Sequence, residues 1–420
     1  MTEIVTLGCR LNAFESEVMR RHADQAGLTD TVIINTCAVT KEAERQARQT
    51  IRKLRRERPD ARIIVTGCAA QLHPERFAAM KEVDRVLGNI EKLEPASYAD
   101  TTNPVSVSDI MAARDDAPHL YDGPPLDGFG ERARAFVQIQ QGCDHRCTFC
   151  IIPFARGRSV SLAPERVIEQ VRHLTASGYS EVVMTGVDIS SYGADLGGSL
   201  TLGMLASRLL AEVPELKRLR LSSLDPAVVD ERLIALLAEE PRLMPHIHLS
   251  LQAGDDLVLK RMKRRHLTAD AVALARQLRA ARPDVVFGAD LIAGFPTETE
   301  EQFRNGLAHV AEFGEWGLVY LHVFPYSAHE STPSAKMPQV PMPERKRRAA
   351  ALRDLGDELL ARYLDSRVGT TAAVLVEAQG SGRSEHYAPV RLPAGVAPGA
   401  IVTARIESRA DHSLVGVAAA

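Results

Sequence analysis

The sequence predicts an α/β protein in three parts: an amino-terminal parallel α/β domain, a partial (β/α)6 barrel and a small carboxy-terminal β-barrel. Two observations carry this prediction. Strand-like apolar runs alternate with helical patterns between residues 3 and 323, which is typical of parallel sheets covered by helices. After residue 366, short strand-like runs separated by Gly and Pro replace that alternation. The length of 420 residues agrees, because it exceeds one ordinary domain.

The amino-terminal domain is expected over residues 1–108. Its strands are predicted at Glu3–Leu7, Asp30–Asn35, Arg62–Thr66 and Arg85–Leu87. Helical patterns cover Asn12–Ala26 and Lys41–Glu57, and the second ends before Pro59. Residues 109–132 contain acidic, Pro and Gly residues without periodicity, so we expect them to form a linker.

The middle domain is expected over residues 133–365 as six βα repeats, a partial TIM-like barrel with its chemistry at the carboxyl ends of the strands. Its strands are predicted at Phe136–Gln140, Glu181–Thr185, Arg218–Ser222, His246–Leu251, Val285–Leu291 and Gly317–Val323. Its helices are predicted at Pro164–Ala176, Leu202–Val213, Ala227–Glu239, Ala269–Arg279 and Thr299–Phe313, with a basic helix from Glu344 to about Leu364. The tail, residues 366–420, has strand-like runs at Thr371–Glu377, Ala388–Leu392 and Ile401–Ser408.

Three cysteines follow the first predicted barrel strand at the spacing C-x3-C-x2-C: Cys143, Cys147 and Cys150. On a loop at a strand end, this spacing lets three thiolates converge on one inorganic cluster. A structural zinc site normally takes four ligands, and a cubane iron–sulfur cluster can use four thiolates. Three thiolates around a 4Fe–4S cube therefore leave one iron open. The alternatives are buried small residues or a partial zinc knuckle.

A second set of cysteines lies in the amino-terminal domain, where Cys9, Cys37 and Cys68 each come directly after the end of a predicted strand. The carboxyl ends of parallel strands lie along one edge of a sheet, where ligands usually bind. The sequence therefore predicts a second three-cysteine cluster site. Alternatively, each could be an ordinary buried residue, since free Cys is among the most buried types.

The composition is that of a globular protein, with 45% hydrophobic and 25% charged residues and a net charge of −3. No signal peptide and no membrane-spanning run is found, so we expect a cytoplasmic protein. In such a protein, six cysteines are expected to serve metal or redox chemistry rather than disulfides. We also expect a monomer. Basic residues gather in Lys41–Arg58, Lys260–His266 and Arg345–Arg348. Such runs are usually solvated helix faces, but three of them raise the prospect of a nucleic-acid partner.

The whole chain resembles the radical S-adenosylmethionine (SAM) methylthiotransferases. The resemblance lies in Asn35-Thr36-Cys37, Gly67-Cys68, the cysteine loop with Ile151-Ile152-Pro153, Gly294-Phe295-Pro296, and a tail segment, Gly382–Tyr387, similar to a TRAM barrel. Three further segments are similar to the branch that acts on threonylcarbamoyladenosine: Ala38-Val39-Thr40, Phe154–Ser159 and His322–Ser327. The sequence departs from the family at Ala13, Phe14 and Thr297, the last standing where Gly is usual.

The resemblance implies two 4Fe–4S clusters and SAM as cofactors. Cys143, Cys147 and Cys150 would hold the cluster that cleaves SAM to a deoxyadenosyl radical, and Cys9, Cys37 and Cys68 the cluster that carries sulfur. The implied enzyme is a tRNA (N6-L-threonylcarbamoyladenosine-C2)-methylthiotransferase, which adds a methylthio group to adenosine 37 beside the anticodon. Its implied partners are the tRNA anticodon arm, an electron donor such as a flavodoxin or ferredoxin, and a sulfur source.

Alternative functions stay open on the sequence. The chain could act on isopentenyladenosine of tRNA or on an aspartate of a ribosomal protein, or it could be an RNA-binding protein whose clusters are only structural. If the partner is tRNA, we expect the basic helix Lys41–Arg58 and the tail barrel to bind its anticodon arm.

Further candidates for the SAM pocket lie at the predicted strand ends of the barrel. They are Thr185, Gly186, Ser222, Ser223 and Gln252. Phe149, within the cysteine loop, could pack against the SAM adenine or be a core aromatic. His246 and His248 face the same side of one strand, and we expect them to line the barrel interior or to pack there rather than to bind a metal.

Overall fold

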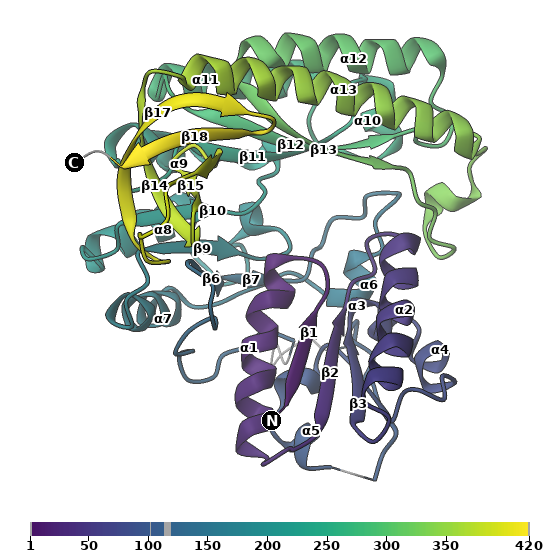
Figure 1. The fold of residues 1–420 in the computed structure, drawn as a ribbon. Helices are drawn as coiled ribbons and strands as arrows, with labels where there is room; N and C mark the ends of the chain where they lie inside the picture. Colours follow the sequence, from purple (N-terminus) through teal and green to yellow (C-terminus); the bar gives the residue numbers. More distant parts are fainter. Residues whose placement is uncertain (1, 101, 113–118, 419–420) are drawn as a thin grey trace.

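The computed structural model describes residues 2–100, 102–112 and 119–418. Figure 1 shows the three predicted parts: the amino-terminal sheet at the bottom, the strands of the barrel above it, and the tail barrel packed at one side of those strands. In the described part of the chain, no helix is both long and apolar enough to cross a membrane.

The amino-terminal domain is a five-stranded parallel sheet whose strands follow in sequence order. The strands are β1 (Glu3–Thr6), β2 (Thr31–Thr36), β3 (Arg62–Gly67), β4 (Arg85–Leu87) and β5 (Val105–Ser106), with helices α1 (Arg10–Gln25), α2 (Lys41–Glu57), α3 (Cys68–Leu72), α4 (Pro74–Ala78) and α5 (Ala96–Ala99). The prediction lacked β5, because two residues at a sheet edge leave no periodic pattern.

Helix α2 shows why the local sequence folds as it does. The Thr40 side chain accepts a hydrogen bond from the amide of Ala43 at 3.1 Å and so caps the helix. Glu42 and Glu44 lie in the first turn and basic residues in the last, which suits the helix dipole. The face bearing Ala47, Ile51 and Leu54 is buried, so most of the basic side chains point to solvent.

The middle domain confirms the partial (β/α)6 barrel. Its strands pair in parallel within two groups, β6-β9-β10 and β11-β12-β13, which single bridges join at Leu219↔Leu243 and Leu224↔Leu249. The strands are β6 (Ala135–Gln138), β9 (Glu181–Thr185), β10 (Arg218–Leu221), β11 (His246–Gln252), β12 (Val286–Ala293) and β13 (Leu318–Pro325), and the helices are α7 (Pro164–Ala176), α8 (Leu202–Glu212), α9 (Glu231–Glu239), α10 (Asp256–Arg261), α11 (Thr268–Ala281) and α12 (Glu300–Glu315). Helix α9 begins four residues later than predicted, because Asp230 caps it through the amide of Leu233.

The connection between the first two domains is packed into the core where it is described. Tyr121 and Phe129 lie 6.0 and 6.4 Å from the ring of Phe14 on α1, and Phe129 lies 5.8 Å from Phe136 on β6. Residues 113–118 of the predicted linker lie outside the described residues. The aromatic residues in this segment therefore fix the amino-terminal domain against the barrel.

Helix α13 (Met342–Arg367) packs along β13 and leads into the tail, a closed five-stranded barrel in the order β14-β15-β16-β18-β17. The strands are β14 (Thr371–Ala378), β15 (Ser381–Ser384), β16 (Pro389–Arg391), β17 (Ile401–Ala410) and β18 (Ser413–Ala418). The prediction found three of them and lacked β15 and β18. The Arg218 guanidinium donates to the carbonyl of Ala373 at 2.7 Å, and Tyr320 donates to that of His386 at 3.0 Å, so the tail is fastened to the middle domain.

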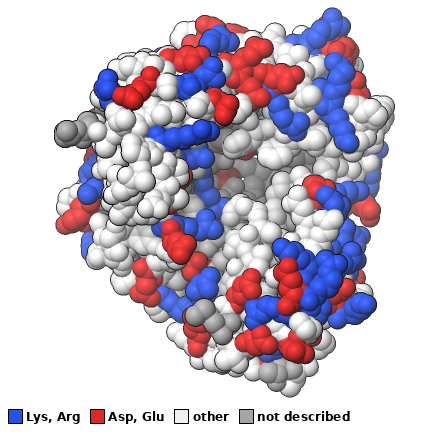
Figure 2. Space-filling view, in the orientation of Figure 1, with Lys and Arg blue, Asp and Glu red and all other residues white. Residues whose placement is uncertain are grey.

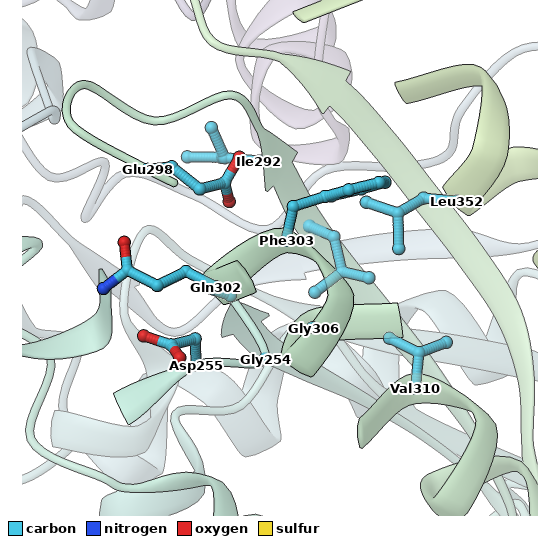
Figure 3. Close-up of a pocket in the computed structure, with 11 residues that line it drawn as sticks. Gly254, Asp255, Ile292, Glu298, Gln302, Phe303, Gly306, Val310 and Leu352 are labelled. Carbon is cyan, nitrogen blue, oxygen red and sulfur yellow. The ribbon is translucent and has the colours of Figure 1, made fainter. Parts of the chain in front are cut away.

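Contacts from Glu298 and from helix α13 fix the loop Gly294-Phe295-Pro296. The Glu298 carboxylate accepts the amide of Gly294 at 2.9 Å and lies 2.8 Å from Arg348 of α13. Figure 3 shows the cavity next to this contact, with Glu298, Gln302 and Asp255 along one side and Phe303, Val310 and Leu352 along the other. No cysteine lines this cavity, so it lies apart from both cysteine sites.

Thr297 follows this loop in a left-handed backbone conformation, with φ at +67°. That conformation costs a non-glycine residue roughly 1–2 kcal/mol, and glycine avoids the cost at some expense in chain entropy. The side-chain oxygen of Thr297 is also buried without a hydrogen-bond partner. Thr297→Gly should therefore raise the free energy of unfolding by about 1 kcal/mol, measured as a higher urea midpoint.

The matched control is Gly294→Ala. Gly294 has φ at +72°, and a Cβ there would lie 2.6 Å from Cγ of Arg345, so this change should lower the midpoint. If Thr297→Gly also lowered it, the threonine side chain would be contributing contacts that outweigh the strain.

Candidate functional site: two cysteine sites and the barrel interior

The loop that carries Cys143, Cys147 and Cys150 lies between a short ribbon, β7 (Gln140–Gln141) with β8 (Val160–Ser161), and helix α6 (Ile152–Arg156). Thr148 fixes its middle, donating its amide to Met262 at 3.1 Å and its hydroxyl to Arg261 at 2.8 Å. Gly142, with φ at +71°, is required at the start, because a Cβ there would overlap the carbonyl of Arg158.

Gln140 connects this loop to the end of β9. Its side-chain amide donates to the carbonyl of Gly142 at 2.7 Å, while its side-chain oxygen accepts the amides of Val187 and Asp188 at 3.0 and 2.8 Å. Gly186 lies beneath it, since a Cβ at that position would be 2.7 Å from the Gln140 carbonyl. The sequence prediction lacked Gln140, which carries no motif that distinguishes it from other strand-end residues.

Burial governs the protonation of two of these three thiols. Burial raises the pKa of Cys143 and of Cys150 to about 12, so both are protonated at neutral pH without a metal. Metal binding therefore displaces protons, as thiolate ligation requires. The Arg264 guanidinium lies 3.6 Å from Sγ of Cys147, and Asp188 lies 4.0 Å from Sγ of Cys143. No fourth cysteine lies in this loop, which leaves one metal position open to another ligand.

The three amino-terminal cysteines are brought to one edge of their sheet, as predicted. Cys9 caps α1, Cys37 follows β2 and Cys68 begins α3. The loops approach closely, because a Cβ at Gly8 would lie 2.7 Å from Cβ and 3.0 Å from Sγ of Cys37. Burial, together with the neighbouring thiols of Cys68 and Cys9, raises the pKa of Cys37 to about 12. The three thiols are thus brought to neighbouring loops at one sheet edge, where they could hold a second metal cluster.

Arg156 of α6 links the two cysteine sites. Its guanidinium is buried, donates to Sγ of Cys68 at 3.1 Å and contacts Glu15 of α1 at 2.5 Å. Glu15 also pairs with Lys92 at 2.6 Å and accepts from Gln141, next to the cysteine loop, at 3.3 Å. Burial alone would raise the pKa of Glu15, but the two cations outweigh it and lower that pKa to about 2. The network thus holds a cation against the amino-terminal thiols.

The predicted SAM-pocket residues lie at the carboxyl ends of the strands. Thr185 ends β9, Ser222 and Ser223 follow β10, and Gln252 ends β11 with φ at +69°. Phe149 is half-buried against the apolar cluster that contains Ala253, Phe295 and Tyr326. Gly186 follows Thr185 at the end of β9, and the role of these residues and of Phe149 toward SAM stays a prediction.

The barrel interior presents histidines where strands β11 to β13 lie side by side. His246 is buried and stacks on Tyr387 of the tail at 5.1 Å, so the prediction of a packing residue is confirmed for it. His248, Asp290 and His322 form a group whose ligand atoms all lie within 4.8 Å of one another. The prediction lacked Asp290, and it named His322 only as part of a motif.

Two of the three basic runs contribute some of their arginines to contacts inside the protein, while Lys260, Lys263 and Arg347 of the same runs are exposed. Arg264 and Arg265 both lie 3.3 Å from Asp225, while Arg345 and Arg348 are buried against the loops around Gly294. The run on α2 differs. Figure 2 shows basic side chains gathered over this helix, and exposed Arg52 and Arg56 have no ion-pair partner among the described residues.

Comparison with known proteins shows which families this chain is similar to. Residues 137–309 match the family model of the Radical SAM superfamily, and residues 2–88 match "Uncharacterized protein family UPF0004". The chain is similar to the radical S-adenosylmethionine methyltransferase TsrM of Kitasatospora setae, solved with cobalamin and a [4Fe-4S] cluster, at a TM-score of 0.49 and 19% identity over 76% of this chain and 68% of that one. The family match and the cysteine loop define a radical SAM protein.

Curated relatives narrow the class further. The chain is 49% identical to the threonylcarbamoyladenosine tRNA methylthiotransferase MtaB of Rickettsia prowazekii, over 96% of this chain and 94% of the relative. Identity is 36% to the protein of that name from Bacillus subtilis, over 85% and 80%. It is 35% to the tRNA-2-methylthio-N(6)-dimethylallyladenosine synthase of Sorangium cellulosum, over 90% and 82%. The chain belongs to the family of radical SAM tRNA methylthiotransferases.

Proposed function

We propose that this protein adds a methylthio group to C2 of N6-threonylcarbamoyladenosine, next to the anticodon of tRNA. One observation carries the proposal: two three-cysteine sites, each at the carboxyl ends of parallel strands, are held in one body by the Arg156 network. A protein with only one site has no evident place for both a radical source and a sulfur carrier.

The assignment of cofactors follows from the two sites. Cys143, Cys147 and Cys150 would hold a 4Fe–4S cluster that binds SAM, and Cys9, Cys37 and Cys68 would hold a second cluster that supplies sulfur. When bound and reduced, the first cluster supplies the electron that cleaves SAM to a radical able to remove hydrogen from an unreactive carbon. The protein's own residues position the base between the two sites, with Thr185, Ser222 and Gln252 at the mouth where SAM would lie.

The threonylcarbamoyl branch is favoured over the isopentenyl branch by relatives. Identity reaches 49% over nearly the full length for a threonylcarbamoyladenosine enzyme, against 35% for a dimethylallyladenosine enzyme. We also propose that tRNA lies across α2, where Arg52 and Arg56 offer exposed charges for phosphate. A flavodoxin or ferredoxin would supply electrons and a separate donor the sulfur, in the cytoplasm where tRNA is modified.

The test is anaerobic turnover of the reconstituted protein on anticodon stem-loops that carry either the threonylcarbamoyl or the isopentenyl group. Mass spectrometry of the digested nucleosides should show a methylthio product on the threonylcarbamoyl RNA only. Product on the isopentenyl RNA alone would overturn the branch, and modification of a ribosomal protein with no RNA product would overturn the tRNA substrate.

A further inference from the structure

A polar stripe runs along the inside of the barrel on three neighbouring strands. Side chains alternate along a strand, so His246 and His248 of β11 share one face, as do Gly288 and Asp290 of β12 and Tyr320 and His322 of β13. The register places His248 opposite Gly288 and Asp290 opposite His322. A Cβ at Gly288 would lie 2.5 Å from Nδ1 of His248, so the glycine makes room for that ring.

Asp290 organises two of these histidines. Its carboxylate lies 3.2 Å from Nε2 of His248 and 3.3 Å from Nδ1 of His322, and the two rings are 5.0 Å apart. The side chain of His248 is 10% exposed, while that of His322 is 60% exposed. When the His322 ring is neutral, Asp290 fixes the proton on Nδ1, which leaves Nε2 as an exposed acceptor.

A guanidinium from the amino-terminal domain reaches the same space. Arg10, the residue after Cys9, donates to the hydroxyl of Tyr387 at 3.4 Å and lies 5.8 Å from the centre of that ring. The neighbouring arginines, Arg134 and Arg220, are both paired with Glu181, at 2.7 and 2.9 Å. In the described part of the chain, no carboxylate lies within ion-pair distance of Arg10, so its charge is available to a ligand.

A series of ring contacts connects Arg10 to His322: Tyr387, which Arg10 contacts, stacks on His246 at 5.1 Å, and the ring of His248, two residues along the same strand face, lies 5.0 Å from that of His322. Burial lowers the pKa of His246, and the charges of Arg220, His248, Arg10 and His322 lower it further. Figure 2 shows this face of the molecule hollowed between the amino-terminal domain and the barrel, with basic side chains along the wall beside the tail barrel. The ligand for such a space carries a negative charge and a hydroxyl group, and it reaches the space from beside Cys9.

We propose that Arg10 binds the carboxylate, and His322 the hydroxyl, of the threonyl group on the substrate adenosine. This proposal rests on the proposed function, and it names the residues that distinguish the substrate from other modified adenosines. On adenine, C2 and C6 flank N1 and the threonylcarbamoyl group is carried by N6 on C6, so holding that group at Arg10, the residue after Cys9, directs the same edge of the base toward the amino-terminal cysteines. An isopentenyl group offers no partner to Arg10 or to Nε2 of His322, and covering these polar groups without giving them partners disfavours it strongly.

The experiment compares three anticodon stem-loops under anaerobic turnover: one with the threonylcarbamoyl group, one with its carboxylate converted to an amide, and one with a glycylcarbamoyl group, which lacks the hydroxyl. Wild-type protein should prefer the threonyl carboxylate over the amide by at least about 100-fold in kcat/KM. Arg10→Gln should lose about that factor on the carboxylate RNA and little on the amide, so the preference disappears. His322→Phe should remove the preference for threonyl over glycyl and keep the preference for carboxylate.

Control measurements distinguish a failure of this proposal from a failure of the proposed function. Iron content should match wild type in both variants, which shows that the clusters are intact. Arg52→Gln on α2 is the matched arginine change outside the barrel and should weaken all three RNAs alike. If Arg10→Gln also weakened them alike, or if wild type ignored the amide change, the proposal would be wrong. A metal ion beyond the iron, lost in His322→Phe, would equally overturn it by making the histidine group a metal site. Wild type inactive on every RNA would instead contradict the proposed function.

Discussion

Cys37→Ala should abolish the methylthio product while SAM is still cleaved to deoxyadenosine, and Cys147→Ala should abolish both. The two cysteines belong to separate sites: Cys37 lies at the edge of the amino-terminal sheet, and Cys147 lies in the barrel loop beside Arg264. Each change removes one thiolate of a three-thiolate set, and the remaining two do not hold a cluster of this kind firmly. Anaerobic iron analysis should fall from about eight to about four atoms per chain in each variant.

Deoxyadenosine and the modified nucleoside are measured in the same reaction, so the two activities have independent readouts. Each cysteine variant serves as the control for the other. Normal product from Cys37→Ala would show that the amino-terminal thiols are only structural. Loss of SAM cleavage in both variants would mean that the two sites do not divide the labour.

Arg156→Leu should destabilise the protein by about 3 kcal/mol and weaken the amino-terminal metal site. Removing one partner of a buried ion pair leaves a desolvated charge behind, which is costly even though Lys92 still faces Glu15. The change also removes the cation from Sγ of Cys68, and a positive charge beside a cluster sulfur favours the reduced state. The reduction potential of the amino-terminal cluster should therefore become more negative.

Two measurements check this: the urea midpoint of the full chain, and a redox titration in a Cys147→Ala background, where only the amino-terminal cluster remains. Arg156→Lys keeps the charge but loses the second donor, so its potential should lie nearer to wild type than that of Arg156→Leu. An unchanged midpoint and potential in Arg156→Leu would show that the network in the structure does not bear on either property.

The sequence predicted the elements whose signal is local. Lys41–Glu57, Pro164–Ala176 and Glu181–Thr185 have the predicted ends, because caps and apolar periodicity mark them directly. The cysteines were also predictable, since spacing and strand-end position are visible in the chain. Short edge strands such as β5 and the serine- and glycine-containing β15 carry too little pattern to be recognised.

What the sequence did not reveal depends on contacts between distant residues. Glu15 meets Lys92 across 77 positions and Arg156 across 141, and nothing local marks a glutamate on α1 as buried. The group of His248, Asp290 and His322 likewise comes from three strands and needs their register. The basic runs were ambiguous for a related reason, because charge alone does not tell a solvated arginine from one that holds a loop.

The contact between Tyr387 and His246 makes the tail barrel part of the wall of the middle-domain barrel. Tyr387 has a left-handed backbone, with φ at +71°, and lies at the first residue of β11, so the tail closes the amino-terminal end of the barrel interior. Reactive intermediates in such enzymes must be kept from bulk water. A chain that ends before residue 366 would lack Tyr387, so the amino-terminal end of its barrel would be open to solvent. We expect such a chain to cleave SAM without forming a matching amount of methylthio product.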